Sequence, residues 1–153
     1  MQTAPHVNFK GNCREAFSFY AETFGGRIVF AMTYGEAPGS ESAPAEVRRQ
    51  IIHARVDFGG QYLLGCDAPA DRYQAPQGFA VMAAVEKPAD AERIFEALAE
   101  SGTISMPFQE TFWAHGFGMC TDRFGTPWMV NCAKPPEALE AVRGRSAASA
   151  GRT

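Results

Sequence analysis

Glu110 and His115 are the residues whose types and spacing point most directly to catalysis. A carboxylate and an imidazole act as general acid and base when both reach a substrate. The two stand five positions apart, and side chains five apart on an extended strand point to opposite faces. They therefore form a catalytic pair only if the backbone turns at residues 114–116. The alternative, in which Glu110 is a buried structural carboxylate paired with a nearby arginine, stays open.

The remaining histidines and the cysteines give weaker indications of chemistry. His6 and His53 each stand on an apolar segment, where an imidazole serves as a ligand or as a hydrogen-bonded part of the core. The four cysteines contain no CxxC pair, so neither a zinc ribbon nor a thioredoxin-type pair is predicted. The first six residues lack the basic and apolar regions of a secretory signal. We therefore expect free thiols and a cytoplasmic location.

Composition limits the partners of the chain. It has 153 residues and is 46% hydrophobic, which is typical of one globular domain with a sizeable core. Fourteen Lys+Arg against seventeen Asp+Glu give a formal charge of -3, whereas a nucleic-acid binder carries a basic stripe. The longest apolar run, residues 79–85, is far shorter than the roughly 20 residues of a membrane-spanning helix. A small-molecule ligand is the remaining expectation, with neither nucleic acid nor membrane as partner.

The hydrophobic pattern predicts short strands and two helices. Asn12 is expected to cap the first helix, with Glu15 completing a capping box, and Gly25 is expected to end it. Pro88 is expected to start the second helix. A loop is predicted over 35–50 and a flexible tail over 135–153. The predicted strands are 6–10, 27–34, two within 51–65 that turn at 59–60, 79–86, 104–113, 116–121 and 127–132.

The two halves of the chain repeat one another. Residues 58–69 lie over residues 124–135 at an offset of 66, and the pairs Gly26/Gly102 and Ile28/Ile104 share an offset of 76. The order strand-helix-strand-strand-strand therefore occurs twice. A single such module has one sheet face covered by its helix and one left open. The sequence predicts an α+β fold in which two βαβββ modules form a curved sheet around a central cavity, which is a usual place for a small ligand.

Three segments carry a family resemblance. The sequence MPFQETFWAHGFG at 106–118 and DRFGTPWMVN at 122–131, together with FKGNCREAFSFY at 9–20, resembles the PhnB-like branch of the vicinal oxygen chelate superfamily. That superfamily includes glyoxalase I, bleomycin-resistance proteins and extradiol dioxygenases. The resemblance covers residues 6 to about 134. It implies a single glyoxalase-like domain over 1–134, with module 1 at about 5–69 and module 2 at about 78–134.

The resemblance also implies where a divalent metal would bind. Enzymes of the superfamily typically carry His, Gln or Glu on the first strand of each module and Glu or another ligand on the fourth. The offsets carry these positions onto His6, Met82, Leu63 and Met129, and only His6 is a ligand type. We therefore expect no metal cofactor, although a divalent metal stays possible, with His6 and Glu110, His115 or His53 as its ligands. We instead expect an apolar ligand cavity lined by His6, Leu63, Met82, Trp113 and Met129.

Several functions stay open at this point. One is a glyoxalase-type enzyme, acting as lyase, isomerase or dioxygenase with or without metal. Another is a protein that only binds a small, partly apolar metabolite in the cavity, as bleomycin-resistance relatives do. Methyltransferase, a label given to some relatives, is disfavoured because the sequence has no glycine-rich strand-to-helix turn suited to S-adenosylmethionine. Exposed strand edges favour a homodimer.

Overall fold

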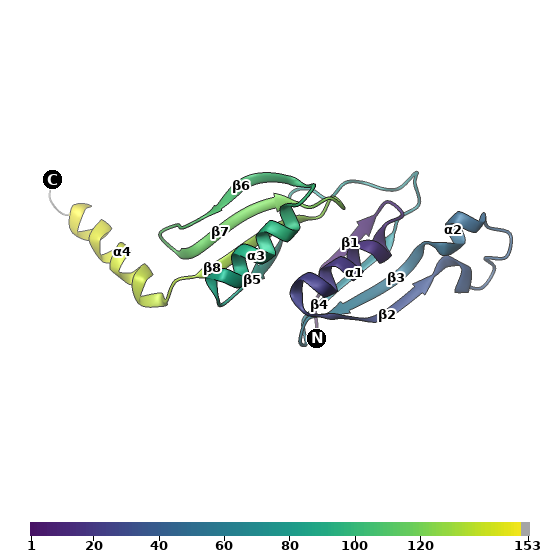
Figure 1. Ribbon diagram of the computed structural model, residues 1–153, viewed down its shortest axis with the longest axis horizontal. Coiled ribbons are helices and arrows are strands. Elements are labelled where there is room, and N and C mark those ends of the chain that lie inside the picture. The colour runs from purple at the N-terminus through teal and green to yellow at the C-terminus, as the bar shows by residue number, and fades with distance from the viewer. Residues whose placement is uncertain (151–153) are drawn as a thin grey trace. The chain divides into compact units, whose positions relative to one another are not determined.

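The computed structural model describes the backbone of residues 1–150 and the side chains of residues 1–143. The chain divides into two compact units. The first comprises residues 1–79 with 124–126, and the second comprises 80–123 together with the chain from residue 127 onward. Each unit contains one four-stranded sheet and one helix that lies against a face of that sheet (Figure 1). Within the described residues, no helix combines the length and apolar character needed to cross a membrane.

In the first unit the strands lie in the order β1-β4-β3-β2. Strand β1 runs parallel to β4, and the other neighbours are antiparallel. Helix α1 follows β1 in the chain and contacts β2, β3 and β4. The bounds of these elements are β1 His6–Phe9, α1 Cys13–Phe24, β2 Arg27–Thr33, β3 Ile51–Asp57 and β4 Tyr62–Asp67.

Alternation along β4 defines the two faces of the first sheet. Leu63 and Gly65 are buried, whereas Tyr62 and Leu64 are partly exposed. A Cβ atom added to Gly65 would lie 2.6 Å from Cζ of Phe17 on α1, so the odd-numbered residues of β4 face the helix. The even-numbered residues lie on the opposite face, which we call the open face of the first sheet.

Helix α1 begins at a buried carboxylate that comes from a distant part of the chain. Asn12 precedes the helix, but its side chain makes no capping hydrogen bond. Instead, Asp67 Oδ1 accepts the backbone N–H of Cys13 at 2.9 Å, and its Oδ2 accepts the N–H of Ile51 at 2.7 Å. The predicted capping box is therefore wrong, because the cap comes from the end of β4. Gly25 ends the helix with φ 70°, as predicted.

The second unit repeats the topology of the first. Its strands lie in the order β5-β8-β7-β6, with β5 parallel to β8, and α3 contacts the last three strands. Pro88 opens α3, as predicted. The predicted α+β class with two βαβββ modules is confirmed, while the pairing of the modules around a cavity and the domain boundaries stay predictions. The bounds are β5 Val81–Ala84, α3 Pro88–Ala99, β6 Thr103–Gln109, β7 Ala114–Thr121 and β8 Pro127–Ala133.

The predicted irregular segments contain helices. The 35–50 segment contains a single 3-10 turn, η1 (Tyr34–Glu36), and a short helix, α2 (Ala45–Arg49). The tail, predicted to be frayed, forms helix α4 over Pro136–Ala150, consistent with the strong helix propensity of its alanine, glutamate and leucine residues. Residues 151–153 of that predicted tail lie outside the described residues.

Strand pairing corrects the offset between the two modules. His6 pairs with Leu64, and Met82 pairs with Met129, so Leu64 is the equivalent of Met129. The predicted equivalence of Leu63 with Met129 is therefore wrong by one residue. The cause is the length of the hairpin turn, which has four residues (58–61) between β3 and β4 but five (122–126) between β7 and β8.

Candidate ligand-binding site

Four of the predicted site residues lie on or beside one face of the second sheet. Met82 and Met129 are direct strand partners, and Met129 also pairs with Met119 of β7. His115 lies on the same side of β7 as Met119, because Gly116 and Gly118 between them pack against Phe108 and the helix residue Phe95. The ring of Trp113 packs on Phe117 at a centroid distance of 5.4 Å. We call this side the open face of the second sheet.

Glu110 stands beside this face rather than on it. The chain turns at Thr111–Ala114, where the N–H of Thr111 donates to the carbonyl of Ala114 at 3.1 Å, so Glu110 lies just after the end of β6 and His115 near the start of β7. The Glu110 carboxylate forms an ion pair with Lys134, whose Nζ also donates to the Thr111 carbonyl at 2.8 Å.

The ion pair further favours the ionised form of Glu110. The hydrogen bond from Lys134 and its positive charge lower the pKa of the Glu110 carboxyl, and His115 lowers it further. Glu110 is therefore ionised at neutral pH and poorly suited to donate a proton. Glu110 is paired, as in the structural alternative, but its partner is lysine in place of arginine and its side chain is exposed rather than buried.

His6 and His53 come together on the open face of the first sheet. Their rings lie nearly parallel, with centroids 6.2 Å apart and an interplanar angle of 19°. Partial burial lowers the pKa of His6, and the neighbouring His53 lowers it further. His6 is therefore neutral at pH 7, with ring nitrogens that can donate and accept hydrogen bonds.

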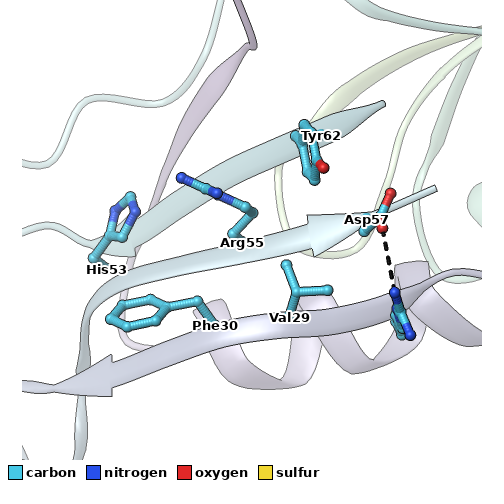
Figure 2. Close-up of a pocket in the computed structure, with 7 residues that line it drawn as sticks. Val29, Phe30, His53, Arg55, Asp57 and Tyr62 are labelled. Atoms are coloured by element: carbon cyan, nitrogen blue, oxygen red, sulfur yellow. Dashed lines mark ion pairs between the residues drawn. The ribbon is translucent and has the colours of Figure 1, made fainter. Parts of the chain in front are cut away.

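A pocket of about 470 Å³ lies on this open face, across β2, β3 and β4. Figure 2 shows Val29 and Phe30 on β2, His53, Arg55 and Asp57 on β3, and Tyr62 on β4. Its volume falls within the range of roughly 300–1,000 Å³ typical of small-molecule sites. The pocket therefore combines aromatic walls with polar groups on one strand.

Ring contacts organise the interior of this pocket. The Arg55 guanidinium carbon lies 5.4 Å from the centre of the Tyr62 ring, in the geometry of a cation–π contact. The Phe30 ring lies 5.7 Å from that of His53. Of the residues that line the pocket, sequence reasoning identified only His53. The sequence did indicate Arg55, because alternation along the strand places it on the same face as His53 and Asp57.

Leu63 does not lie in this pocket. It is only 2% exposed and faces α1, so the expectation that it lines a ligand cavity is wrong by the same one-residue shift in register. Leu64 takes its place on the open face, between its strand partners His6 and Arg55.

The comparisons identify the family. The model of the Glyoxalase/Bleomycin resistance protein/Dioxygenase superfamily matches residues 4–130. The chain belongs to this superfamily. Protein YjdN of Escherichia coli (strain K12), a superfamily relative of this chain, is 36% identical to it over 142 residues, which cover 88% of this chain and 97% of YjdN.

Two solved structures agree with this placement in the superfamily. Protein PA1353 from Pseudomonas aeruginosa is 42% identical, with a TM-score of 0.80, over 88% of this chain and 99% of that chain. A PhnB protein from Bacillus cereus, described as a putative 3-demethylubiquinone-9 3-methyltransferase, is 23% identical with a TM-score of 0.74, over 87% of this chain and 100% of that chain. The first structure supports placement in the superfamily, and the second, at 23% identity, shows the shared fold.

The residues at the metal positions of the superfamily do not fit a metal ion. With the register corrected, these positions hold His6 and Leu64 on the first sheet and Met82 and Met129 on the second. One imidazole and three apolar side chains supply a single nitrogen donor, whereas a divalent metal site of this class requires about three nitrogen, oxygen or thiolate donors from the protein. Among the residues that the structure describes, no three His, Cys, Asp or Glu side chains gather closely enough to hold a metal.

Proposed function

We propose that this protein binds a small, partly apolar metabolite on the open face of its first sheet, without a metal. The observation that carries the proposal is the pocket of about 470 Å³, whose walls include the exposed ring of Phe30 and the partly exposed ring of Tyr62. The apolar residues at the superfamily's metal positions support the metal-free part of the proposal, because they offer no donor for chelation.

Binding is favoured over catalysis by the state of the candidate acid–base pair. The Glu110 carboxylate is held by Lys134, and the metal positions carry three apolar side chains. A metal-dependent lyase, isomerase or dioxygenase of the superfamily would need ligands at those positions. The methyltransferase description belongs to the Bacillus cereus protein, and at 23% identity it supports no such activity here.

The proposal includes a cytoplasmic homodimer. Strand β2 lies at the edge of its sheet, where one side of its backbone has no neighbouring strand within the described residues, and pairing there would leave Val29 and Phe30 free on the open face. Exposed apolar edge strands favour association, and self-association would cover this one. Light scattering that reports a monomer at micromolar concentration would contradict the dimer.

A thermal-shift screen on chelator-treated protein tests the binding proposal. We expect at least one small aromatic or aliphatic metabolite to raise Tm by roughly 5 °C at about 100 times its Kd. Phe30→Ala should remove most of this shift, because the ring forms a wall of the pocket. Phe112→Ala is the matched control, since Phe112 is exposed in the second unit. Shifts that appear only after a divalent metal is added, or that Phe112→Ala reduces as much as Phe30→Ala does, would contradict the proposal.

A further inference from the structure

The charges around the pocket of the first sheet do not cancel. Asp57 is its only carboxylate among the lining residues, and this group is already engaged. It lies 3.9 Å from the Arg27 guanidinium and accepts the backbone N–H of Gly60 at 2.7 Å. Arg55, on the same face of the same strand, has no carboxylate partner among the residues that the structure describes. One positive charge in the pocket is therefore not balanced by a carboxylate.

Arg55 is oriented for recognition. Its guanidinium lies over the Tyr62 ring, which restricts the orientation of the planar group. Guanidinium groups bind carboxylates through two parallel hydrogen bonds, and pre-ordering the group reduces the entropy lost on binding. His53, next to Arg55 on this face of β3, adds an imidazole that can donate a further hydrogen bond.

The other side of the pocket is apolar apart from Arg27, the residue paired with Asp57. Phe30 is 47% exposed and Val29 is 42% exposed, and both stand on β2 beside the row of polar residues on β3 (Figure 2). The Phe30 ring also contacts His53, so the apolar wall and the polar row meet inside the pocket. A ligand that satisfies both sides carries an anionic group at one end and an apolar or aromatic body at the other.

We infer that the pocket selects small organic acids, in which a carboxylate pairs with Arg55 and an aromatic or aliphatic body packs against Phe30 and Val29. This inference rests on the proposed function and specifies the chemical class of its ligand. Because the charge is supplied by one side chain and the apolar wall by others, the two contributions are separable by mutation.

Isothermal titration with phenylacetate and its neutral amide, phenylacetamide, tests the inference. We expect the wild-type protein to bind phenylacetate about tenfold more tightly than the amide, as is typical of a hydrogen-bonded charge pair. Arg55→Gln should remove this preference without changing affinity for the amide, and Arg55→Lys should restore part of it. Arg72→Gln is the matched control, because Arg72 is exposed in the turn after β4 and does not line the pocket.

The outcomes separate this inference from the proposed function. Equal binding of acid and amide, unaffected by Arg55→Gln, would overturn the assignment of the carboxylate but leave the apolar site intact. Equally tight binding of inorganic phosphate and phenylacetate would overturn the role of the apolar wall. Failure of phenylacetate to bind would overturn the inference, while the metabolite screen would still decide the proposed function.

Discussion

Asp67→Ala is expected to lower the free energy of unfolding by about 3 kcal/mol, because it leaves two buried backbone donors without an acceptor. Asp67 is 1% exposed, and its two carboxylate oxygens accept the N–H groups of Cys13 and Ile51. One side chain thus joins the first turn of α1 to the start of β3. Its loss should weaken both connections at once, and urea denaturation followed by circular dichroism measures the effect.

Two further variants make this prediction specific. Asp67→Asn keeps one acceptor oxygen but turns an amide donor toward the other N–H, so about half of the loss is expected. Asp71→Ala removes an exposed carboxylate four residues later and should have little effect. Equal stability of Asp67→Ala and Asp71→Ala would show that the carboxylate does not hold these two elements together.

The second large effect distinguishes two neighbouring leucines. Leu63→Ala should cost about 3 kcal/mol of stability, because Leu63 is buried beneath α1 and its truncation leaves a cavity in the core. Leu64→Ala should cost about 1 kcal/mol, since Leu64 is partly exposed on the open face. Ligand affinity should respond in the opposite way, falling in Leu64→Ala and persisting in Leu63→Ala under conditions where the latter is folded.

This pair of variants provides its own control. The two residues are of the same type and adjacent in the chain, and they differ in the face of β4 that they occupy. Denaturation and ligand titration on both variants give the comparison. A larger stability loss in Leu64→Ala than in Leu63→Ala would restore the register predicted from the constant offset and remove Leu64 from the open face.

Local sequence patterns predicted most of the secondary structure but not its long-range connections. Gly25 and Pro88 mark helix ends by their own backbone preferences, so their roles could be derived from neighbouring residues alone. The cap of α1 could not, because Asp67 follows Cys13 by 54 residues. The predicted equivalence between residues of β4 and residues of β8 was wrong by one position for a related reason. A turn one residue longer is visible only when both partner strands are known.

The candidate site was predictable in part. The duplicated pattern identified Met82 and Met129, which are strand partners in the structure. Arg55 and Tyr62 were not identified, because they belong to different strands and only pairing brings the guanidinium over the ring. The interpretation of Glu110 was left between two alternatives, since its lysine partner lies 24 positions away.

Apolar side chains stand at three metal positions of the superfamily, and we therefore expect the protein to bind its ligand without a metal. Elemental analysis of protein purified without chelators tests this claim most directly. The positions occupied by Leu64, Met82 and Met129 predict a content of Zn, Ni, Mn and Fe well below one atom per chain. About one tightly bound metal atom per chain, lost together with ligand binding on dialysis against a chelator, would contradict it.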